Sequence, residues 1–462
     1  MRFILRGASK MSIGKWNGSG ATASVLQHLR DTGDVIKYLL TTFVPQQTIQ
    51  ATNLSVEDFW GMAEFCARVH DIGKCTPAFQ YKTPQGETLC NGYDNSNSVN
   101  SPHGLAGAAI LNSFDVPTSV CEVVAAHHGK TIDRGNDTNP AKQFQRFPDN
   151  YGLVNGISPY QREWNVIYHE ALAMSGIDFF PELNIQAQFL ITGLLLMADW
   201  IASNEELFPI EDNDNQELRK NNAFLKLDLP PMWTPMYSHI DNNEFYRQFG
   251  FYPNELQKAC NKIAFENNGS GMMIIESTMG TGKTEAGLSA SEILGFNAGS
   301  GGLYFGLPTQ ATANAILPRI TEWIAHMADG ERVSLRLAHG EAFHNAYYKE
   351  LQINDEIDGI TINQWLSGKH RALLPDFVVG TVDQVLTAGI AQKFVMLLHL
   401  GLAGKVVIID EVHSYDTYMS TYMETVLTWL GLYGVPVILL SSTLTSERKN
   451  ALISAYKGKR IA

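Results

Sequence analysis

A glycine-rich loop between an apolar run and a predicted helix constrains the fold of this chain more than any other feature. The apolar run at residues 272–275 continues into Glu-Ser-Thr-Met-Gly-Thr-Gly-Lys-Thr, which ends at Thr284. In such a loop, backbone N–H groups at a helix N-terminus bind phosphate groups. The pattern departs from the common phosphate-binding motif at Ser277, which stands where the first glycine is expected. A strand, this loop and a helix in succession predict a nucleotide at the edge of a parallel sheet.

Further β-rich runs separated by helical stretches extend this pattern through the second half of the chain. They cover residues 303–305, 333–337, 377–379, 406–409 and 437–440. Strands and helices in alternation are typical of a parallel sheet that is covered on both faces. We therefore predict an α/β P-loop lobe over residues 251–462.

Candidate nucleotide-binding residues fall in two segments of this lobe. In the glycine-rich loop, the backbone of Gly280, Thr281 and Gly282 is predicted to wrap the phosphates, Lys283 to reach the β and γ phosphates, and the Thr284 hydroxyl to meet Mg²⁺. The run at 406–409 ends in Asp410 and Glu411. Asp410 is predicted to hold Mg²⁺, and Glu411 is a catalytic candidate that would orient or deprotonate the attacking water. ATP with Mg²⁺ is the predicted cofactor.

The first part of the chain has the periodicity of helices. Met62, Phe65, Cys66 and Val69 have the i, i+3, i+4, i+7 spacing of one helix face. We predict an all-helical domain over residues 1–205. A stretch rich in Asp, Asn and Pro at residues 206–250 predicts a linker, with a short helix near residues 216–222. The predicted fold class is therefore α + α/β.

Histidines and aspartates near predicted helix ends form a second group of candidates. They are His28, His70, Asp71, His103, His127, His128 and Asp199. Asp199 interrupts an apolar run, where a carboxylate is costly to bury unless it is paired or bound to a cation. Imidazoles with one or two carboxylates suit Mn, Fe, Co, Ni or Zn, and a carboxylate such as Asp71 can bridge two ions. Two bridged ions activate water and neutralise a phosphodiester's charge, which predicts hydrolase chemistry.

Composition limits the partners and the compartment. Lys and Arg number 34 against 47 Asp and Glu, a net charge of −13, so any nucleic acid must be bound by a local groove. The longest apolar stretch, residues 189–198, is about half the length of a membrane helix, and no span is predicted. The N-terminus lacks the apolar core of a signal peptide. An odd number of cysteines, five, without a C-x-x-C pair favours a reducing cytoplasm.

Together these motifs resemble the helicase-nucleases of type I CRISPR systems, in which an HD phosphohydrolase domain precedes a superfamily 2 helicase. The matching stretches in the first half are residues 28–31, 69–74, 79–82, 103–104, 127–129 and 198–200. In the second half they are residues 280–284, 307–314, 382–385, 410–413 and 441–443. The resemblance spans nearly the whole chain, and it implies a RecA-like lobe in the second half.

The resemblance also implies roles for individual residues. One ion would be held by His28, His70, Asp71 and Asp199, and a second by Asp71, His103, His127 and His128, both being Mn, Fe, Co, Ni or Mg. Lys74 would lie close to the scissile phosphate, as a catalytic residue beside Asp71. Gln257 falls where the family reads adenine. Residues in motifs that follow the DNA backbone are Thr309, Gln310, Thr381 and Gln384, and those that couple hydrolysis to movement are Ser441 and Thr443.

The implied function is a metal-dependent single-stranded DNA nuclease joined to the first lobe of an ATP-dependent 3′–5′ helicase. Such enzymes degrade foreign DNA after recruitment by Cascade, the RNA-guided surveillance complex. The family continues with a second lobe and a C-terminal domain beyond the point that corresponds to Ala462. We therefore expect this chain, a cytoplasmic monomer, to bind Mg-ATP, to hydrolyse it poorly and not to unwind DNA alone.

Two alternatives remain open at this point. The first is an HD phosphohydrolase of nucleotides or cyclic nucleotides, with the P-loop half as a regulatory module. It would require a closed pocket for a small substrate. The second is a non-catalytic remnant that binds DNA or Cascade without cleaving DNA.

Overall fold

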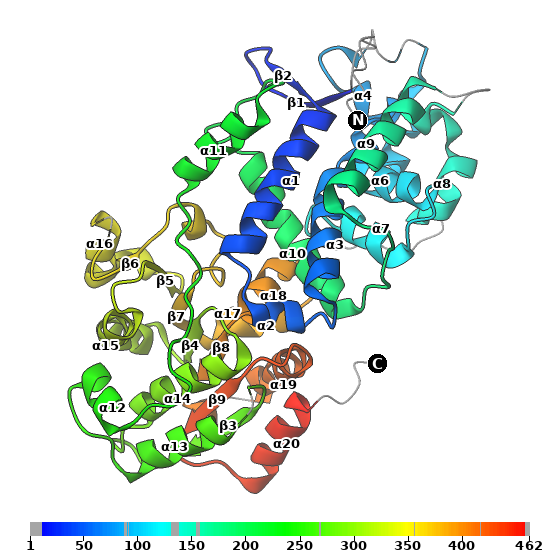
Figure 1. Cartoon of the computed structure of the whole chain (residues 1–462). Coiled ribbons are helices and arrows are strands. Elements are labelled where there is room, and N and C mark those ends of the chain that lie inside the picture. The colour runs from blue at the N-terminus through cyan, green and yellow to red at the C-terminus, as the bar shows by residue number, and fades with distance from the viewer. Residues whose placement is uncertain are drawn as a thin grey trace. The chain divides into compact units, whose positions relative to one another are not determined.

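The computed structural model describes residues 12–86, 90, 92–130, 138–153, 158–267, 269–354, 356–415 and 417–457 (Figure 1). The chain divides into two compact units. The first comprises Met1–Thr41 and Ser55–Leu227, and the second Thr42–Leu54 and Asp228–Ala462. The absence of a signal peptide was predicted from residues 1–11, which lie outside the described residues.

The described part of the first unit is mostly helical. Its helices are α1 (Val25–Thr42), α3 (Val56–Val69), α4 (Pro77–Gln80), α6 (His103–Asn112), α7 (Thr118–Ala125), α8 (Pro140–Arg146), α9 (Pro159–Ser175), α10 (Ile185–Ala202) and α11 (Gln216–Leu227), with 3₁₀ turns η1 (Ile72–Lys74), η2 (Asn95–Asn100) and η4 (Pro148–Tyr151). Side-chain caps fix several helix starts. Ser55 accepts a hydrogen bond from the Asp58 N–H, and Ser158 forms a capping box with Gln161.

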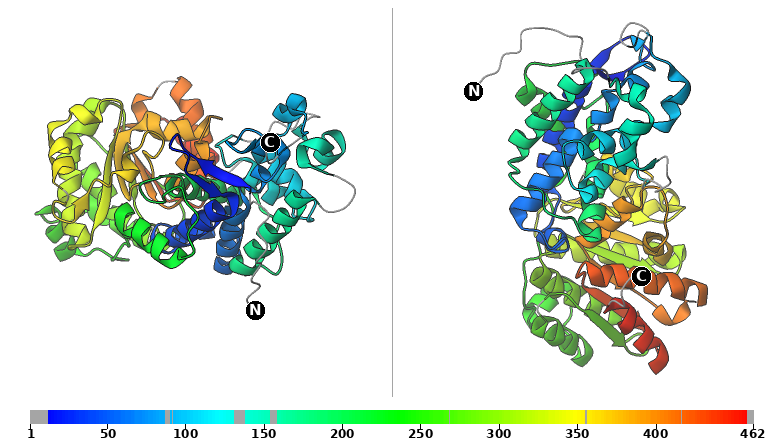
Figure 2. Two further views of the ribbon diagram at one scale, coloured as in Figure 1. Left: turned by 90° about the horizontal axis from the view of Figure 1, so that it is seen from above. Right: turned by 90° about the vertical axis from the view of Figure 1, so that its right-hand side faces the viewer.

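The prediction of an all-helical first domain is wrong in one respect, because the structure has two short strands there. Strands β1 (Ile13–Trp16) and β2 (Thr22–Ser24) pair antiparallel just before α1 (Figure 2). Strands of four and three residues are too short to show a period of two, so periodicity did not reveal them. A side chain distant in sequence holds β1 in place: Gln80 Oε1 accepts from the Ile13 N–H, and Gln80 Nε2 donates to the Ile13 carbonyl.

Helix α10 is the core helix of the first unit. Among the described helices it alone is long and apolar enough to cross a membrane by length and composition, with a mean hydropathy of 1.5. However, 67% of that segment is buried inside the protein. Leu190, Leu194 and Met197 have no exposed surface, which is typical of a helix surrounded by other helices. Its last turns carry Asp199 into this interior.

A parallel sheet forms the centre of the second unit, as predicted. It has seven strands where the sequence pattern indicated six, because the two-residue strand β6 (Ile360–Thr361) is too short to show a pattern. The strands are β3 (Met272–Glu276), β4 (Leu303–Leu307), β5 (Val333–Ala338), β6 (Ile360–Thr361), β7 (Phe377–Thr381), β8 (Val406–Ile409) and β9 (Val437–Ser441), in the order β3-β9-β8-β4-β7-β5-β6. All the pairings between them are parallel. Neighbouring strands of a parallel sheet place their carboxyl ends at one edge, so the residues after β3 and β8 share that edge.

Helices pack against both faces of this sheet. Phe305, Val379 and Ile408 belong to one hydrophobic cluster, and the alternate residues Tyr304 and Val407 are also fully buried. Because successive side chains of a strand point to opposite faces, both faces are covered. The helices of this unit are α2 (Gln46–Gln50), α12 (Asn242–Phe249), α13 (Glu255–Glu266), α14 (Lys283–Ala298), α15 (Gln310–Ala328), α16 (Ala346–Ile353), α17 (Val382–Leu386), α18 (Val395–Ala403), α19 (Thr417–Leu432) and α20 (Ser446–Tyr456), with 3₁₀ turns η5 (Ala342–His344), η6 (Trp365–Ser367), η7 (Thr387–Gly389) and η8 (Val412–Ser414).

The division into units follows contacts that the sequence pattern does not reveal. Helix α2 lies early in the chain, yet Gln47 Nε2 donates to the carbonyls of Ala403 and Lys405 in the second unit. The passage from the first unit to the second, after Leu227, falls inside the segment predicted as a linker. Helix α11 in that segment is part of the first unit, because Arg219 forms a buried ion pair with Asp31 of α1 at 2.9 Å.

A buried carboxyl in α14 makes the stability of the second unit depend on pH. Burial raises the pKa of Glu292 to about 8, against the smaller opposing effect of the Gln248 amide that donates to it. The folded state therefore holds this proton more tightly than the unfolded state, and stability falls as the pH rises from about 4.5 to 8. We expect Glu292→Gln to stabilise the protein by on the order of 3 kcal/mol at pH 8 and much less at pH 5.

Calorimetric unfolding at the two pH values tests this expectation. Glu350→Gln, at an exposed position of α16, is the matched control and should change neither transition. An equal loss of stability in wild type and Glu292→Gln between pH 5 and 8 would contradict the raised pKa of Glu292.

Candidate metal centre and nucleotide site

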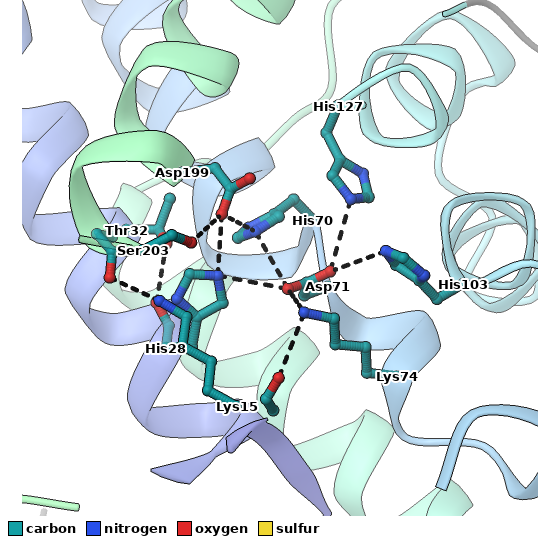
Figure 3. A network of polar contacts seen from close by, with 12 residues as sticks. Lys15, His28, Thr32, His70, Asp71, Lys74, His103, His127, Asp199 and Ser203 are labelled. Carbon is teal, nitrogen blue, oxygen red and sulfur yellow. Dashed lines mark hydrogen bonds and ion pairs between the residues drawn. The ribbon is translucent and has the colours of Figure 1, made fainter. Parts of the chain in front are cut away.

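The seven predicted ligands lie together in the first unit, and Figure 3 shows six of them. They are His28 in α1, His70 and Asp71 after α3, His103 at the start of α6, His127 and His128 after α7, and Asp199 in α10. Their ligand atoms form two groups, one of His28, His70 and Asp71 and one of His103, His127 and His128, within each of which they lie no more than 4.8 Å apart. The first group holds three of the four residues that the resemblance implies for one ion, without Asp199, and the second holds three of the four implied for the other ion, without Asp71.

Asp71 lies between the two groups. Its Oδ2 is 3.4 Å from His28 Nε2 and 3.5 Å from His70 Nε2. Its Oδ1 is 3.5 Å from His103 Nε2 and 3.6 Å from His127 Nε2. One carboxylate that offers a separate oxygen to each set of imidazoles has the arrangement of a bridging ligand.

Asp199 lies beside His28 and His70, and His128 lies beside His103. Asp199 Oδ1 is 3.1 Å from His28 Nε2 and 3.6 Å from His70 Nε2, and it accepts a hydrogen bond from Ser203 Oγ at 3.1 Å. His128 Nε2 is 2.6 Å from His103 Nε2. Two ring nitrogens at this distance cannot both carry protons, so at least one of them presents a lone pair.

The unsatisfied atoms of this cluster fit divalent cations. His70 Nδ1 donates to the Ala67 carbonyl at 2.8 Å, and His127 Nδ1 donates to the Val124 carbonyl at 2.6 Å. Each bond places the ring proton on Nδ1 and leaves Nε2 to act as a ligand, as at many metal sites. The buried atoms His70 Nε2, His127 Nε2 and Asp71 Oδ1 have no hydrogen-bond partner. Buried polar atoms without partners are costly, and two cations would satisfy them, one beside His70 and the other between His127 and Asp71 Oδ1.

Electrostatics favours the neutral form of four imidazoles and the ionised form of the carboxylates, as metal ligands need. At His70 it favours the charged ring, which a bound cation would deprotonate. Burial lowers the pKa of His127 well below its usual value and that of His103 to about 4, so both rings are neutral at pH 7. Burial also lowers the pKa values of His28 and His128, whereas Asp71 and Asp199 outweigh burial at His70 and raise its pKa. Burial opposes ionisation of Asp71, but the Lys74 ammonium and the His70 imidazole outweigh it and hold its pKa well below the usual range.

Lys74 lies at the mouth of the cluster. Its Nζ is 2.6 Å from Asp71 Oδ2 and donates to the Gly14 carbonyl at 3.4 Å. A cavity of about 400 Å³ opens beside it, and His103 and His128 also line this cavity. An ammonium group in this position can bind an anion that enters the cavity.

The close approach of η1 to α6 requires glycine at position 73. A Cβ at Gly73 would lie 2.0 Å from the His103 carbonyl oxygen and 2.5 Å from the Gly107 nitrogen, both backbone atoms. We expect Gly73→Ala to destabilise the first unit by about 3 kcal/mol or more, because backbone must move to admit the methyl group. The same movement would separate His70 and Asp71 from His103 and weaken Mn²⁺ binding.

Thermal unfolding and a Mn²⁺ titration measure the two effects of Gly73→Ala. Gly18→Ala is the matched control, because a Cβ there meets nothing within 4 Å. Unchanged stability and unchanged Mn²⁺ affinity in Gly73→Ala would refute the expected clash.

The glycine-rich loop of the second unit has the conformation that a phosphate-binding loop needs. Gly280 and Gly282 have φ angles of 78° and 81°, which side-chain-bearing residues rarely adopt. Helix α14 begins at Lys283, so the N–H groups of the loop stand at a helix N-terminus. Lys283 Nζ donates to the carbonyls of Ser277 and Thr278 at 2.7 and 3.0 Å, and a phosphate can replace these acceptors.

Asp410 and Glu411 face this loop from the end of β8. A cavity of about 450 Å³ is lined by both of them and by Gly280, Thr281, Gly282, Lys283 and Thr284. Burial raises the pKa of Asp410 to about 6, and the neighbouring Glu411 carboxylate adds to the increase. Glu411 has a φ of 52°, a strained conformation for a residue with a side chain, and such strain is frequent at functional sites.

Gln257 also lies against the loop. Its side chain closes a capping box with Asn254 at the start of α13, and Nε2 donates to the Gly282 carbonyl at 3.2 Å. A Cβ at Gly282 would meet Gln257 Nε2 at 2.5 Å. Gln257 lines the same cavity as the loop and Asp410.

The remaining helicase-type motif residues lie at strand and helix ends. Thr309 caps α15 and is followed by Gln310; Thr381 ends β7 and Gln384 lies in α17. Ser441 ends β9, where His413 Nδ1 lies 3.2 Å from its Oγ and Thr443 accepts its hydrogen bond. Ser441 thus links the end of β9 to η8, the turn after Asp410 and Glu411.

Sequence reasoning did not single out several residues that border the two sites. Lys15 and Trp16 line the cavity at the metal cluster, and Arg319 lines the cavity at the loop, where it forms an ion pair with Glu285. A lone basic residue in the middle of a helix carries no recognisable motif. Lys15 and Trp16 lie in a strand that periodicity could not detect.

Comparison with known proteins gives a family for each unit. Residues 14–208 match the family "Cas3, HD domain", and residues 254–451 match "DEAD/DEAH box helicase". The chain is 34% identical over 93% of its length to the CRISPR-associated nuclease/helicase Cas3 of Streptococcus thermophilus. It is 28% identical over 95% of its length to the CRISPR-associated endonuclease/helicase Cas3 of Thermus thermophilus. The chain spans about half the length of these relatives, 51% and 50%.

Solved structures show the same likeness. T. fusca Cas3 with ATP superimposes with a TM-score of 0.81 at 26% identity, over 97% of this chain and 52% of the other. A CRISPR RNA-guided surveillance complex in a pre-nicking state contains a chain that matches 96% of this one with a TM-score of 0.70 at 25% identity.

A helical unit with a His-Asp cluster, joined to a P-loop lobe with a parallel sheet, defines an HD-type domain followed by a helicase-type RecA-like lobe. The predicted fold class is thereby confirmed, apart from the β1–β2 pair. The two family matches and the relatives named Cas3 agree: residues 14–208 are similar to a Cas3 HD domain, and residues 254–451 are similar to a DEAD/DEAH box helicase domain.

Proposed function

We propose that this chain is a metal-dependent nuclease of single-stranded DNA, joined to the ATP-binding lobe of a 3′–5′ DNA helicase that acts in CRISPR defence. The cluster around Asp71 carries the proposal, because buried ligand atoms without partners converge there in two groups that could each hold a cation. The names of the relatives and the fold of both units support the same activity.

Two divalent ions, Mn, Fe, Co, Ni or Mg, are the proposed cofactors of the first unit. His28, His70, Asp71 and Asp199 would hold one, and Asp71, His103, His127 and His128 the other. Bound there, such ions supply Lewis-acid activation of water and neutralise the charge of a phosphodiester. Lys74 would bind the scissile phosphate from the cavity side, since its ammonium group lies 2.6 Å from Asp71.

ATP with Mg²⁺ is the proposed ligand of the second unit. Residues 280–284 would wrap the phosphates, with Lys283 paired to them and Gln257 toward the base. Asp410 would face the Mg²⁺ and Glu411 the attacking water, because both line the same cavity as the loop. T. fusca Cas3 has been solved with ATP and with ADP on the corresponding fold, which supports this assignment.

The proposed partners are single-stranded DNA and Cascade. The match to a chain of an RNA-guided surveillance complex in a pre-nicking state supports the second partner. With a net charge of −13, the chain needs local cationic sites to bind DNA, and Lys15 and Lys74 at the cavity are such sites. We propose that the protein works as a monomer in the cytoplasm.

One assay separates this function from its alternatives. The full chain is incubated with circular single-stranded DNA and, separately, with a cyclic dinucleotide, with Mn²⁺ or with EDTA. We expect Mn²⁺-dependent cleavage of the circle and no hydrolysis of the dinucleotide. Hydrolysis of the dinucleotide alone would identify a nucleotide phosphohydrolase, and binding of DNA without cleavage in Mn²⁺, Co²⁺ or Ni²⁺ would identify a non-catalytic module.

A further inference from the structure

Strand β1 forms one wall of the cavity at the metal cluster through Lys15 and Trp16. The cavity is lined by the candidate ligands His103 and His128, the catalytic candidate Lys74, and Gly14, Ser203, Glu205 and Ile210. Its remaining lining residues are Lys15, Trp16 and Phe79. These side chains combine positive charge with aromatic surface. Nothing in an HD metal site requires this combination, because metal ligands are imidazoles and carboxylates.

Lys15 brings a second ammonium group to the cluster. Its Nζ donates to the Ala202 carbonyl at 2.6 Å, at the end of the helix that carries Asp199. Figure 3 shows Lys15 in the same network as His28, and Lys74 paired with Asp71. An ammonium group has three protons, so Lys15 keeps donors for an anion in the cavity after this one bond. The two lysines thus flank the space in front of Asp71.

Two aromatic rings continue this wall outward from the cluster. The ring of Phe79 stands edge-on to His103, with centroids 5.4 Å apart, and Lys74 Nζ lies 5.6 Å from its centroid. The Trp16 indole stands edge-on to Phe79 at 6.2 Å, and 38% of Trp16 is exposed. A large aromatic side chain that remains exposed at the mouth of a cavity can stack on a planar ligand.

The strand that carries Lys15 and Trp16 is firmly held. The fully buried Gln80 side chain bonds both backbone groups of Ile13 and the Lys74 carbonyl. On the preceding residue, Ser12 donates its N–H and its hydroxyl to Glu163 at 3.0 and 2.6 Å. Lys15 and Trp16 are therefore presented from a fixed strand, as positioning groups need to be.

We propose that Lys15 and Trp16 position the substrate at the metal centre, Lys15 by pairing with a backbone phosphate and Trp16, with Phe79, by stacking on the base of an adjacent unpaired nucleotide. This inference rests on the proposed nuclease function and names the substrate feature that the site recognises. Aromatic stacking accepts every base, so the wall is tolerant of sequence. Bases in a duplex are stacked on each other and cannot reach Trp16, so the wall selects single strands.

Steady-state cleavage of a short single-stranded oligonucleotide in Mn²⁺ by the full chain tests the role of Trp16. We expect Trp16→Ala to raise KM about 10- to 100-fold with little change in kcat, and Trp16→Phe to restore most of the loss. With an oligonucleotide of abasic nucleotides, wild type should show the same raised KM and Trp16→Ala should add nothing to it. Phe179→Ala, at a 74% exposed position of the same unit, is the matched control.

The salt dependence of kcat/KM tests the role of Lys15. A single-strand phosphate contact contributes about 0.7 to the slope of log affinity against log salt, so we expect Lys15→Met to reduce the slope by about that amount. Mn²⁺ affinity should not fall below the wild-type value in either variant, and thermal stability should fall by no more than the loss of the single Lys15–Ala202 hydrogen bond accounts for.

The outcomes distinguish this inference from the function on which it rests. Wild-type kcat/KM in Trp16→Ala and Lys15→Met would overturn the inference and leave the nuclease function standing. A loss of Mn²⁺ affinity, or of more stability than that hydrogen bond accounts for, in these variants would also overturn it, by showing a structural role. Failure of the wild-type chain to cleave any single strand in Mn²⁺ would instead refute the proposed function.

Discussion

Replacing Asp71 with asparagine is expected to reduce Mn²⁺-dependent cleavage of single-stranded DNA on the order of 10³-fold or more, equivalent to about 4 kcal/mol of transition-state stabilisation. The reason is its central position: Oδ2 faces His28 and His70, and Oδ1 faces His103 and His127. An amide keeps the shape but loses the charge and one of the two ligand oxygens, so neither set of imidazoles would retain its shared carboxylate. Cleavage rates and a Mn²⁺ titration by calorimetry measure the loss.

Two comparisons make the Asp71→Asn result specific. Asp178→Asn, at an exposed position in the same unit, removes an equal charge and should leave cleavage and metal binding unchanged. Thermal unfolding shows whether the variant is folded. If Asp71→Asn is folded and cleaves DNA at the wild-type rate, the Asp71 cluster is not the nuclease centre.

The sequence indicated most members of this cluster because they lie at a helix end or interrupt an apolar run. His70 caps the C-terminus of α3, His103 opens α6, and His127 follows α7, so each imidazole leaves its helix at a point where the backbone turns. Asp199 interrupts a run of buried residues in α10, and burying a lone carboxylate there is costly. Such local patterns can be recognised in the sequence because they depend on residues that are adjacent in the chain.

Other parts of the structure depend on contacts between distant segments and left no such signal. Strand β1 is held by Gln80, and α2 joins the second unit through the bond of Gln47 to Ala403. Strand β1 also carries Lys15 and Trp16, whose side chains line the cavity at the metal cluster. Single residues of this kind carry no period and no motif, so only the fold reveals which site they border.

In the second unit, the order of the strands could not be predicted from the sequence, but the candidate nucleotide-binding residues at the strand ends could. A motif after a strand stays at the carboxyl edge of a parallel sheet whatever the strand order. The loop after β3 and the pair Asp410 and Glu411 after β8 therefore line one cavity, although β9 lies between their strands.

Replacing Lys283 with alanine is accordingly expected to weaken ATP binding about 100-fold, or about 2.7 kcal/mol. Lys283 is 8% exposed, and its Nζ is held at the carbonyls of Ser277 and Thr278, inside the loop whose N–H groups would bind the phosphates. Alanine removes the one ammonium group that the loop directs at these phosphates, while the loop N–H groups remain. Titration with a fluorescent ATP analogue in Mg²⁺ measures the change.

The control for Lys283→Ala must separate loss of a contact from loss of charge. Lys262→Ala removes a cation from an exposed position of α13 in the same unit, so its ATP affinity should equal that of wild type. Mn²⁺-dependent cleavage of single-stranded DNA without ATP should be unchanged in both variants, because Lys283 and Lys262 lie in the second unit and the metal cluster in the first. Equal ATP affinity in wild type and a folded Lys283→Ala protein would show that the nucleotide is not held by this loop.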